Sequence, residues 1–236
     1  MEDVIAEVEA YMETLVTEDD KPVDNIFSDF QNRLLVESLR SSWRPVDENG
    51  APRKYLAVSD VGIFYGLRQK PVAPDVLLSL DVEAPGEWWG RKSRSYFTWE
   101  FNKAPEIVVE VVSNREGNET GTKLRDYAVI GVPYYVIFDP GNFLDDDVLR
   151  IFKLDVRRYV AYHESYFPEV GLGVTLWEGS YEDSKPSLWL RWCDAQGNLI
   201  LTGAERAARE AERAALLAAK LRELGVDPDQ ILSGKQ

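Results

Sequence analysis

The spacing of apolar and polar positions divides the chain into helical and strand-like segments. Apolar residues at helical spacing predict a helix that is capped by Asn25 or Ser28 and extends through Leu39. Two short runs, Val76–Leu80 and Ile107–Val112, are dominated by apolar residues, many of them β-branched. Such runs are typical of strands that are buried on both faces of a sheet.

The second of these runs begins a strand, helix, strand sequence. Lys123–Ile130 has helical spacing and is followed by Gly131 and Pro133, residue types that end helices. The apolar run Tyr134–Phe138 then predicts another strand. Because a strand, a helix and a second strand over about 30 residues form a βαβ unit, we expect the two strands to be parallel.

The remaining pattern predicts further strands and a terminal helix. The other predicted strand segments are Lys54–Gly66, Tyr96–Phe101, Leu149–Leu154, Tyr159–His163, Val174–Trp177 and Leu188–Cys193. The last four indicate an antiparallel β extension, and Ala204–Leu224, rich in Ala, Glu, Arg and Leu, predicts a C-terminal helix. We therefore divide the chain into an acidic, helical leader (residues 1–24), an α/β domain (residues 25–203) and a C-terminal helical segment (residues 204–236).

Composition and charge narrow the class of protein. The chain has 236 residues, 44% of them hydrophobic, which suits one globular domain with a substantial core. Its only cysteine, Cys193, excludes an intrachain disulfide and favours a reducing cytoplasm, and no apolar run predicts a membrane span. The net charge of −14 disfavours tight non-specific binding to DNA, although residues 1–24 hold nine acids against Lys21, a net of −8.

A carboxylate interrupts the predicted strand Ile107–Val112. An ionised Glu110 there would cost several kcal/mol unless a metal, a proton or a cation compensates it. Asp75 comes directly before the strand Val76–Leu80, and Lys123 begins the predicted helix. Two acids and a lysine at the edge of a sheet indicate a divalent-metal hydrolase site, in which the carboxylates and the carbonyl oxygen of Val111 bind the metal and the ammonium assists water activation and stabilises negative charge.

Several motifs in this region resemble the Uma2 family of restriction-endonuclease-like proteins in the PD-(D/E)xK nuclease superfamily. The matching segments are Pro74-Asp75, Pro105 to Ser113, Glu119-x-Gly121-x-Lys123-Leu124-x-x-Tyr127, Gly131-Val132-Pro133-x-Tyr135 and Asp139-Pro140. The resemblance covers about residues 25–200 and is most specific from Pro105 to Pro140. It implies a restriction-endonuclease-like α/β fold with a mixed sheet core and flanking helices, and a nuclease that uses Mg²⁺ or Mn²⁺ to cut DNA.

The resemblance also implies roles for single residues. Asp75 would be the first metal ligand and Glu110 the second. In the superfamily a lysine usually stands two residues after the second acid, but that position is Val112 here, and the family pattern points to Lys123 instead. Glu119, four residues earlier, would pair with Lys123 and hold it in place. Superfamily nucleases often carry a further acid on the first core helix, and Glu37 is the candidate.

Partner binding rests on two other segments. Arg91, Lys92 and Arg94 lie close to Trp88 and Trp89, and basic residues beside aromatic ones suit contacts with the phosphates and bases of DNA. An ordinary solvated loop over an apolar patch is the alternative. The Ala-rich C-terminal helix and the resemblance to nucleases that form dimers indicate a homodimer, and docking of this helix on its own domain is the alternative.

Each candidate site residue also has a structural interpretation. Pro-Asp is a common turn dipeptide, Glu110 could pair with an arginine such as Arg125, and Lys123 could be a solvated helix lysine. Two alternatives for function follow. The chain could be an interaction protein that keeps the fold without cleaving DNA, or a metal-dependent hydrolase of another phosphoester.

Overall fold

The structure is a computed structural model that describes residues 25–227 apart from residues 67, 68, 88, 91, 92, 115–118 and 146. The predicted acidic leader, residues 1–24, lies outside the described residues, as does the end of the chain beyond residue 227. None of the helices in the described part combines the length and the apolar character needed to cross a membrane.

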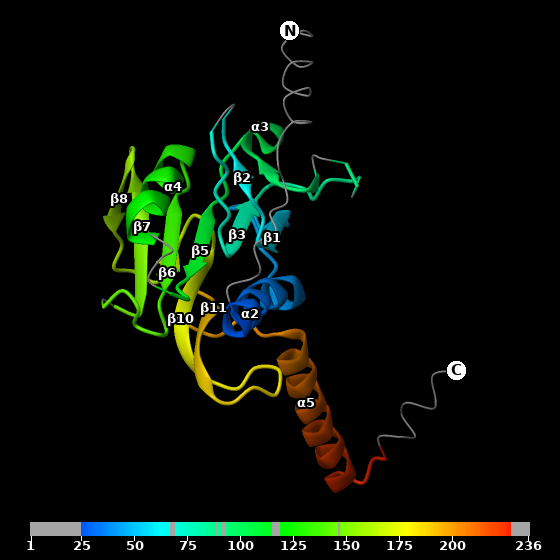
Figure 1. The fold of residues 1–236 in the computed structure, drawn as a ribbon. Helices are drawn as coiled ribbons and strands as arrows, with labels where there is room; N and C mark the ends of the chain where they lie inside the picture. Colours follow the sequence, from blue (N-terminus) through cyan, green and yellow to red (C-terminus); the bar gives the residue numbers. More distant parts are fainter. Residues whose placement is uncertain are drawn as a thin grey trace.

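A six-stranded mixed sheet forms the centre of the domain (Figure 1). Its strands, in spatial order, are β1 (Tyr55–Ser59), β3 (Val76–Leu80), β5 (Ile107–Val111), β6 (Tyr134–Phe138), β7 (Leu149–Asp155) and β8 (Arg158–Ala161). Only β5 and β6 run parallel, and the other neighbours are antiparallel. All five residues of β3, β5 and β6 are buried, as expected for strands covered on both faces.

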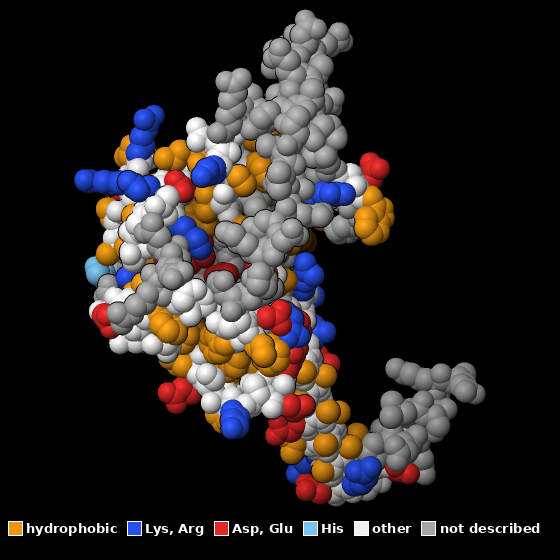
Figure 2. Space-filling view, in the orientation of Figure 1, with side chains coloured by type: hydrophobic (Ala, Val, Ile, Leu, Met, Phe, Trp, Pro, Cys, Tyr) orange, Lys and Arg blue, Asp and Glu red, His pale blue; other side chains and the backbone are white. Residues whose placement is uncertain are grey.

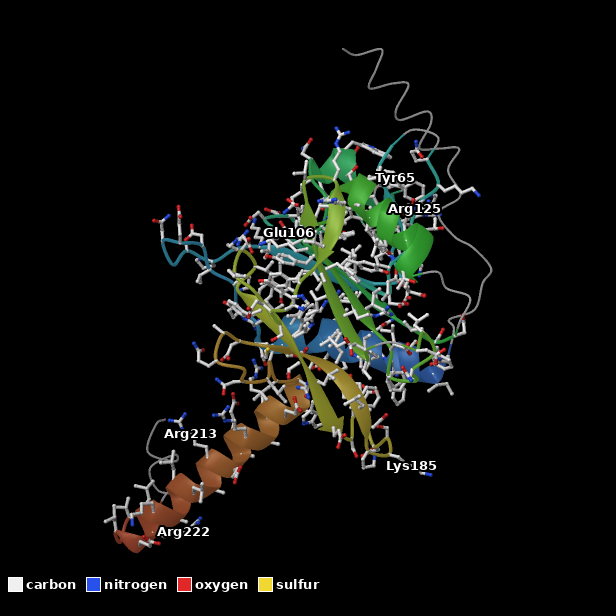
Figure 3. The ribbon with its side chains drawn as sticks, turned by 90° about the vertical axis from the view of Figure 1, so that its left-hand side faces the viewer. Tyr65, Glu106, Arg125, Lys185, Arg213 and Arg222 are labelled. Carbon is white, nitrogen blue, oxygen red and sulfur yellow. The ribbon has the colours of Figure 1, made fainter. Side chains whose placement is uncertain are left out.

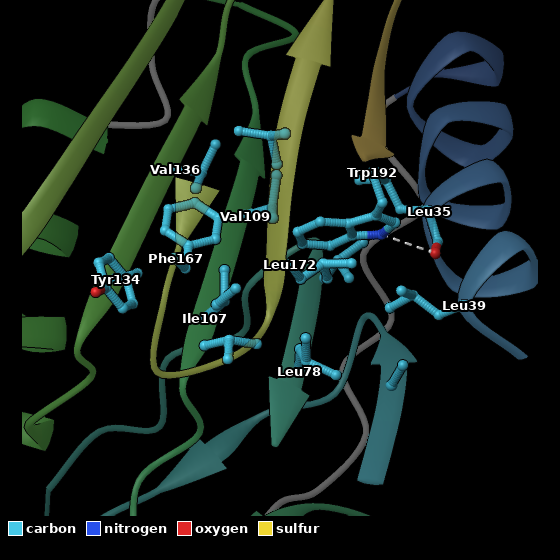
Figure 4. Packing of buried hydrophobic residues seen from close by; sticks show 14 of the residues in the cluster. Leu35, Leu39, Leu78, Ile107, Val109, Tyr134, Val136, Phe167, Leu172 and Trp192 are labelled. Atoms are coloured by element: carbon cyan, nitrogen blue, oxygen red, sulfur yellow. Dashed lines mark hydrogen bonds between the residues drawn. The ribbon is translucent and has the colours of Figure 1, made fainter. Parts of the chain in front are cut away.

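One face of this sheet packs against α2 (Ile26–Ser42) and a second, three-stranded antiparallel sheet (Figure 4). Asn25 caps α2 by accepting a hydrogen bond from the backbone of Ser28, which supplies an otherwise unpaired N–H group with an acceptor. The second sheet contains β9 (Tyr166–Phe167), β10 (Leu172–Gly179) and β11 (Ser187–Cys193). Trp192 lies in this core and donates its indole N–H to the carbonyl of Leu35 at 3.0 Å (Figure 4).

The other face is covered by a π-helical turn, η2 (Glu119–Lys123), and by α4 (Leu124–Ile130). Gly131 ends α4 with a left-handed backbone (φ 90°), a conformation that suits glycine. A short parallel pair, β2 (Ile63–Phe64) and β4 (Tyr96–Phe97), leads into α3 (Thr98–Phe101). Along β5, side chains at 107, 109 and 111 therefore contact the α2 face, and those at 108 and 110 point to the α4 face.

The last helix, α5 (Gly203–Glu223), projects away from the domain (Figures 1 and 3). Its first turn is fixed by Thr202 and Glu205, which form a capping box, and Glu205 also forms a bidentate ion pair with the buried Arg191. No residue of α5 is buried, and Leu216, Leu217 and Leu224 are exposed. The N-terminus of the helix is thus anchored to the domain, whereas its apolar residues are exposed to solvent.

The expected fold class is confirmed: a mixed α/β sheet of restriction-endonuclease-like type carries flanking helices, an antiparallel extension and a C-terminal Ala-rich helix. The predicted strand Tyr96–Phe101 is wrong beyond Phe97. The chain turns there into α3, which ends at Asn102 in the left-handed conformation (φ 56°). Phe97, Trp99 and Phe101 alternate as in a strand, but Phe97 and Trp99 pack together with Phe64 instead of continuing a longer strand.

Candidate functional site

Asp75 and Glu110 meet where β3 begins and β5 ends, in the interior of the central sheet. The antiparallel register of β3 and β5 pairs Val76 with Val109, and its extension by one residue places Asp75 opposite Glu110. The backbone N–H of Val111 donates to Asp75 Oδ2 at 2.6 Å. Opposite residues of an antiparallel pair point to the same face, with Cβ atoms about 4.5–5.5 Å apart. The sheet therefore brings the two predicted metal-binding acids together.

Glu110 lies at the centre of this cluster and is almost fully enclosed, with 1% of its surface exposed. The hydroxyl of Tyr127 donates to its Oε1 at 2.6 Å, and the ammonium of Lys123 donates to its Oε2 at 2.8 Å. Both carboxylate oxygens thus receive a hydrogen bond. Arg125, the alternative partner, is exposed on α4 (Figure 3), and Lys123 occupies the position beside Glu110 instead.

The packing of α4 explains how these donors reach β5. Tyr127 is buried on the inner side of α4, where it packs against Tyr135 with ring centroids 5.0 Å apart. Leu124 and Ile130 also pack against this part of the core. Lys123 is the last residue of η2, directly before α4, so its side chain extends from the same covering layer toward Glu110. Hydrophobic packing of the helix therefore sets the position of both donors.

Burial disfavours the ionised form of both acids. It raises the pKa of Glu110 to about 8, although Lys123 opposes the rise, and the neighbouring charge of Asp75 adds to it. Burial likewise raises the pKa of Asp75 to about 6, against the lowering effects of the Val111 N–H and of Lys123. One ammonium therefore does not compensate both carboxylates, and the site favours a proton or an added cation.

Lys123 is held in its charged form. Burial alone would lower its pKa, but the charge of Glu110 and the hydrogen bond to Glu110 outweigh this effect, so that the pKa is raised. A lysine that stays protonated cannot accept a proton from water near neutral pH. Its ammonium can instead donate hydrogen bonds and stabilise negative charge.

Glu119 is a third buried acid beside Lys123. Only 5% of its surface is exposed, and its Oε1 lies 4.0 Å from Lys123 Nζ. Among the residues that the structure describes, Glu119 Oε2 is buried and has no hydrogen-bond partner. The expected pairing of Glu119 with Lys123 is therefore present only as a long contact, within a π-helical turn rather than an α-helix.

The donor set fits a hard divalent cation. Asp75 and Glu110 supply carboxylate oxygens, the ligand type that Mg²⁺ prefers, and each oxygen that accepts one hydrogen bond keeps further lone-pair capacity. Within the described ranges, no group of three or more His, Cys, Asp and Glu side chains forms a complete cage for a metal ion. Mg²⁺ usually binds through one or two carboxylates together with several waters and substrate phosphate.

Two further charged residues lie in register with Asp75 and Glu110 across the neighbouring strands, and we call this line of residues the Glu110 row. The registers place Asp60 opposite Asp75 on one side, and Glu110 beside Ile137 and then Arg150 on the other. Asp60 has a left-handed backbone (φ 55°), and its charge also raises the pKa of Asp75. Arg150 therefore stands two strands from Glu110 on the same face. Sequence reasoning missed both residues because only the strand register connects them with the acids.

The other predicted site residues lie elsewhere. Glu37 Oε1 accepts hydrogen bonds from Ser41 Oγ and from the backbone N–H of Gly203, both at 2.7 Å, so its hydrogen bonds lead to the start of α5 and not to the two acids. Arg94 is exposed in the segment before β4, and Arg91 and Lys92 lie outside the described residues. Tyr127, which belongs to the matching motif, is both buried and bonded to Glu110.

The surface over α4 and β8 carries several Lys and Arg side chains, and acidic side chains lie beside a basic one near the middle of the same face (Figure 2). Sequence comparison adds one finding. The family model of Uma2, whose description is "Putative restriction endonuclease", matches residues 20–168, which extend from ahead of α2 to the end of β9. No curated protein and no solved structure matches the chain.

Proposed function

This chain belongs to the Uma2 family, and on that premise we propose that it is an endonuclease that hydrolyses DNA phosphodiester bonds with Mg²⁺ or Mn²⁺. The observation that carries the proposal is the convergence of Asp75, Glu110 and Lys123, which lie directly before β3, in β5 and at the end of η2. Two carboxylates and the protonated amine of Lys123 supply the groups that metal-assisted phosphodiester hydrolysis needs.

Asp75 and Glu110 would hold the cation, with the carbonyl oxygen of Val111 as a further ligand. When bound, the cation would activate a water molecule and offset charge on the phosphate. Lys123, which keeps its proton, would donate to a phosphoryl oxygen and stabilise the negative charge that develops there. This role differs from that of a general base, so water activation would depend on the cation.

DNA binding by an acidic chain requires local positive charge. Of the net charge of −14, residues 1–24 carry −8, so the remaining chain carries −6. Basic side chains over α4 and β8 (Figure 2), together with Arg150 in the Glu110 row, support a path for the phosphate backbone across this face. Arg91, Lys92 and Arg94, beside the exposed Trp89, are proposed as a second contact.

A cleavage assay tests the proposal. The parent protein and the variants Asp75→Asn and Glu110→Gln are incubated with plasmid and with single-stranded DNA, in Mg²⁺, in Mn²⁺ and in EDTA. We expect cation-dependent cleavage by the parent and a loss of at least about 100-fold in both variants. Circular dichroism confirms that the variants are folded. Equal cleavage by parent and variants would overturn the assignment of these acids.

A non-cleaving interaction protein is the second candidate, favoured by the net charge of −14 and by the exposed apolar residues of α5. Metal-dependent turnover of another phosphoester is the third, and hydrolysis of nucleotides without any cleavage of DNA would support it. We also propose a homodimer that forms through α5, and a reducing, cytoplasmic location in view of the single Cys193. Sedimentation at high micromolar concentration tests the dimer.

A further inference from the structure

Lys123 stands between two buried carboxylates but bonds only one of them. Its ammonium is 2.8 Å from Glu110 Oε2, a hydrogen-bond distance, and 4.0 Å from Glu119 Oε1, which is too long for one. Glu119 is 95% buried, and no described residue donates to its Oε2. A buried polar atom without a partner is costly, so a native structure that keeps one needs an explanation.

The position of Lys123 conflicts with the proposed role of Glu110. Glu110 already accepts one hydrogen bond at each oxygen, from Tyr127 and from Lys123. A divalent cation that binds Oε2 would face the Lys123 ammonium at short range, and like charges in a buried site repel strongly. Tyr127 is neutral and does not create this conflict. Electrostatic repulsion therefore favours movement of Lys123, the charged donor, and not of Tyr127.

We propose that Glu119 is a positioning residue that receives the Lys123 ammonium from Glu110 when Glu110 binds a divalent cation. The inference rests on the proposed function, because it requires Glu110 to be a metal ligand. Lys123 has four rotatable side-chain bonds, and a change of rotamer is enough to move the ammonium from one carboxylate to the other. Glu119 then gains the hydrogen bond that it lacks, and Glu110 gains free lone pairs.

The local backbone supports this exchange. Glu119 and Lys123 are the first and last residues of η2, and π-helical turns occur frequently at functional sites. Tyr135 donates its hydroxyl to the backbone carbonyl of Glu119 at 3.1 Å, which fixes the start of the turn while leaving the carboxylate available. The lysine therefore has a stationary second acceptor in its reach.

Calorimetric titration with Mn²⁺ tests the proposal in a double-mutant cycle. The full-length parent, Glu119→Gln, Glu119→Ala, Lys123→Met and the two double variants are titrated at one pH, and circular dichroism verifies that each is folded. We expect Glu119→Ala to weaken Mn²⁺ binding about tenfold or more, which is the effect of losing one hydrogen bond to a charged group. Glu119→Gln keeps the size and one acceptor oxygen, so its loss should be smaller.

The Lys123→Met background separates this role from others. Without an ammonium to relocate, Glu119→Ala should leave the Mn²⁺ affinity unchanged, and Lys123→Met should restore the affinity of the Glu119→Ala protein. An equal loss in both backgrounds, or no loss in either, overturns the proposal while the metal site itself stands. Absence of Mn²⁺ binding by the folded parent overturns the proposed metal site, and this inference with it.

Discussion

Asp75 lies opposite Glu110 across the antiparallel pair β3 and β5, with Asp75 Oδ2 bonded to the N–H of Val111, the residue after Glu110. The same strand that carries one acid thus orients the other through its backbone. Because the register fixes both side chains on one face, a shift by one residue would send Glu110 into the core around α2. The metal site that we propose depends on this register.

The affinity for divalent cations should rise with pH. With a pKa of about 8, Glu110 carries a proton in most molecules near neutral pH, and Asp75, with a pKa of about 6, carries one mainly below pH 6; a metal must displace these protons. Titration with Mn²⁺ between pH 5.5 and 8.5 should therefore give affinities that increase up to about pH 8 and then level off. Constant affinity across this range would contradict the raised pKa values.

The metal-free protein should lose stability as the pH rises. The folded-state pKa of Glu110 lies above its ordinary value of 4.5, so the folded state binds the proton more tightly than the unfolded chain. The resulting stabilisation is complete below about pH 4.5 and is lost by about pH 8, a decrease of several kcal/mol in the free energy of unfolding. Urea unfolding in EDTA measures it.

Glu110→Gln should flatten this pH dependence because the variant has no carboxyl group to titrate at that position. Glu210→Gln is the matched control, since Glu210 is exposed on α5, and it should leave the slope of the parent unchanged. A Glu110→Gln protein with the full parental slope would show that Glu110 is not the source of the effect.

Tyr127→Phe should destabilise the protein and raise the pKa of Glu110. Loss of the hydroxyl removes the donor at 2.6 Å from a buried carboxylate oxygen, and we expect a cost of about 1–3 kcal/mol in unfolding free energy. That hydrogen bond lowers the pKa of Glu110, so its loss should shift Mn²⁺ binding to higher pH. Tyr159→Phe, which removes a hydroxyl bonded to the Val132 carbonyl, should leave Mn²⁺ binding unchanged. Identical binding profiles for all three proteins would exclude this role.

Glu205→Ala should destabilise the domain although Glu205 belongs to the projecting helix. The substitution leaves the guanidinium of Arg191, which is 1% exposed, without its bidentate partner at 2.7 and 2.9 Å. The loss of this ion pair and of the capping box should lower the free energy of unfolding, measured in urea, by about 3 kcal/mol. Glu210→Ala removes only an exposed contact with Arg206 and should cost less than about 1 kcal/mol. Equal costs would mean that the base of α5 is not anchored as described.

Much of this site could be predicted from sequence because the features that mark it are local patterns in the chain. Glu110 stands out as an acid in an apolar strand, and Gly131 and Pro133 mark the end of the helix that carries Tyr127. The positions of Asp75 and Lys123 beside predicted elements suggested that they join Glu110, and the resemblance to a family then implied a role for each. Burial of a charge is visible in one strand, whereas its compensation depends on residues that are distant in the chain.

Other features depend on tertiary contacts that no local pattern contains. Glu37 lies on the first core helix, where the resemblance implied a site acid, but its carboxylate accepts a hydrogen bond from the start of α5. Asp60 and Arg150 join the row of Glu110 only through the register of four strand pairs. Tyr127 has the pattern of a core aromatic residue, and the partner of its hydroxyl becomes evident only when the helix is placed on the sheet.

A crystal structure of the parent protein soaked in Mn²⁺ would show whether Asp75 and Glu110 hold a cation, because anomalous scattering locates the ion independently of any activity. We expect a single strong peak in contact with carboxylate oxygens of both Asp75 and Glu110, and no such peak in crystals of the Asp75→Asn variant. A parent structure that retains the bonds of Glu110 to Lys123 and Tyr127, with no ion beside the two acids at saturating Mn²⁺, would contradict this expectation.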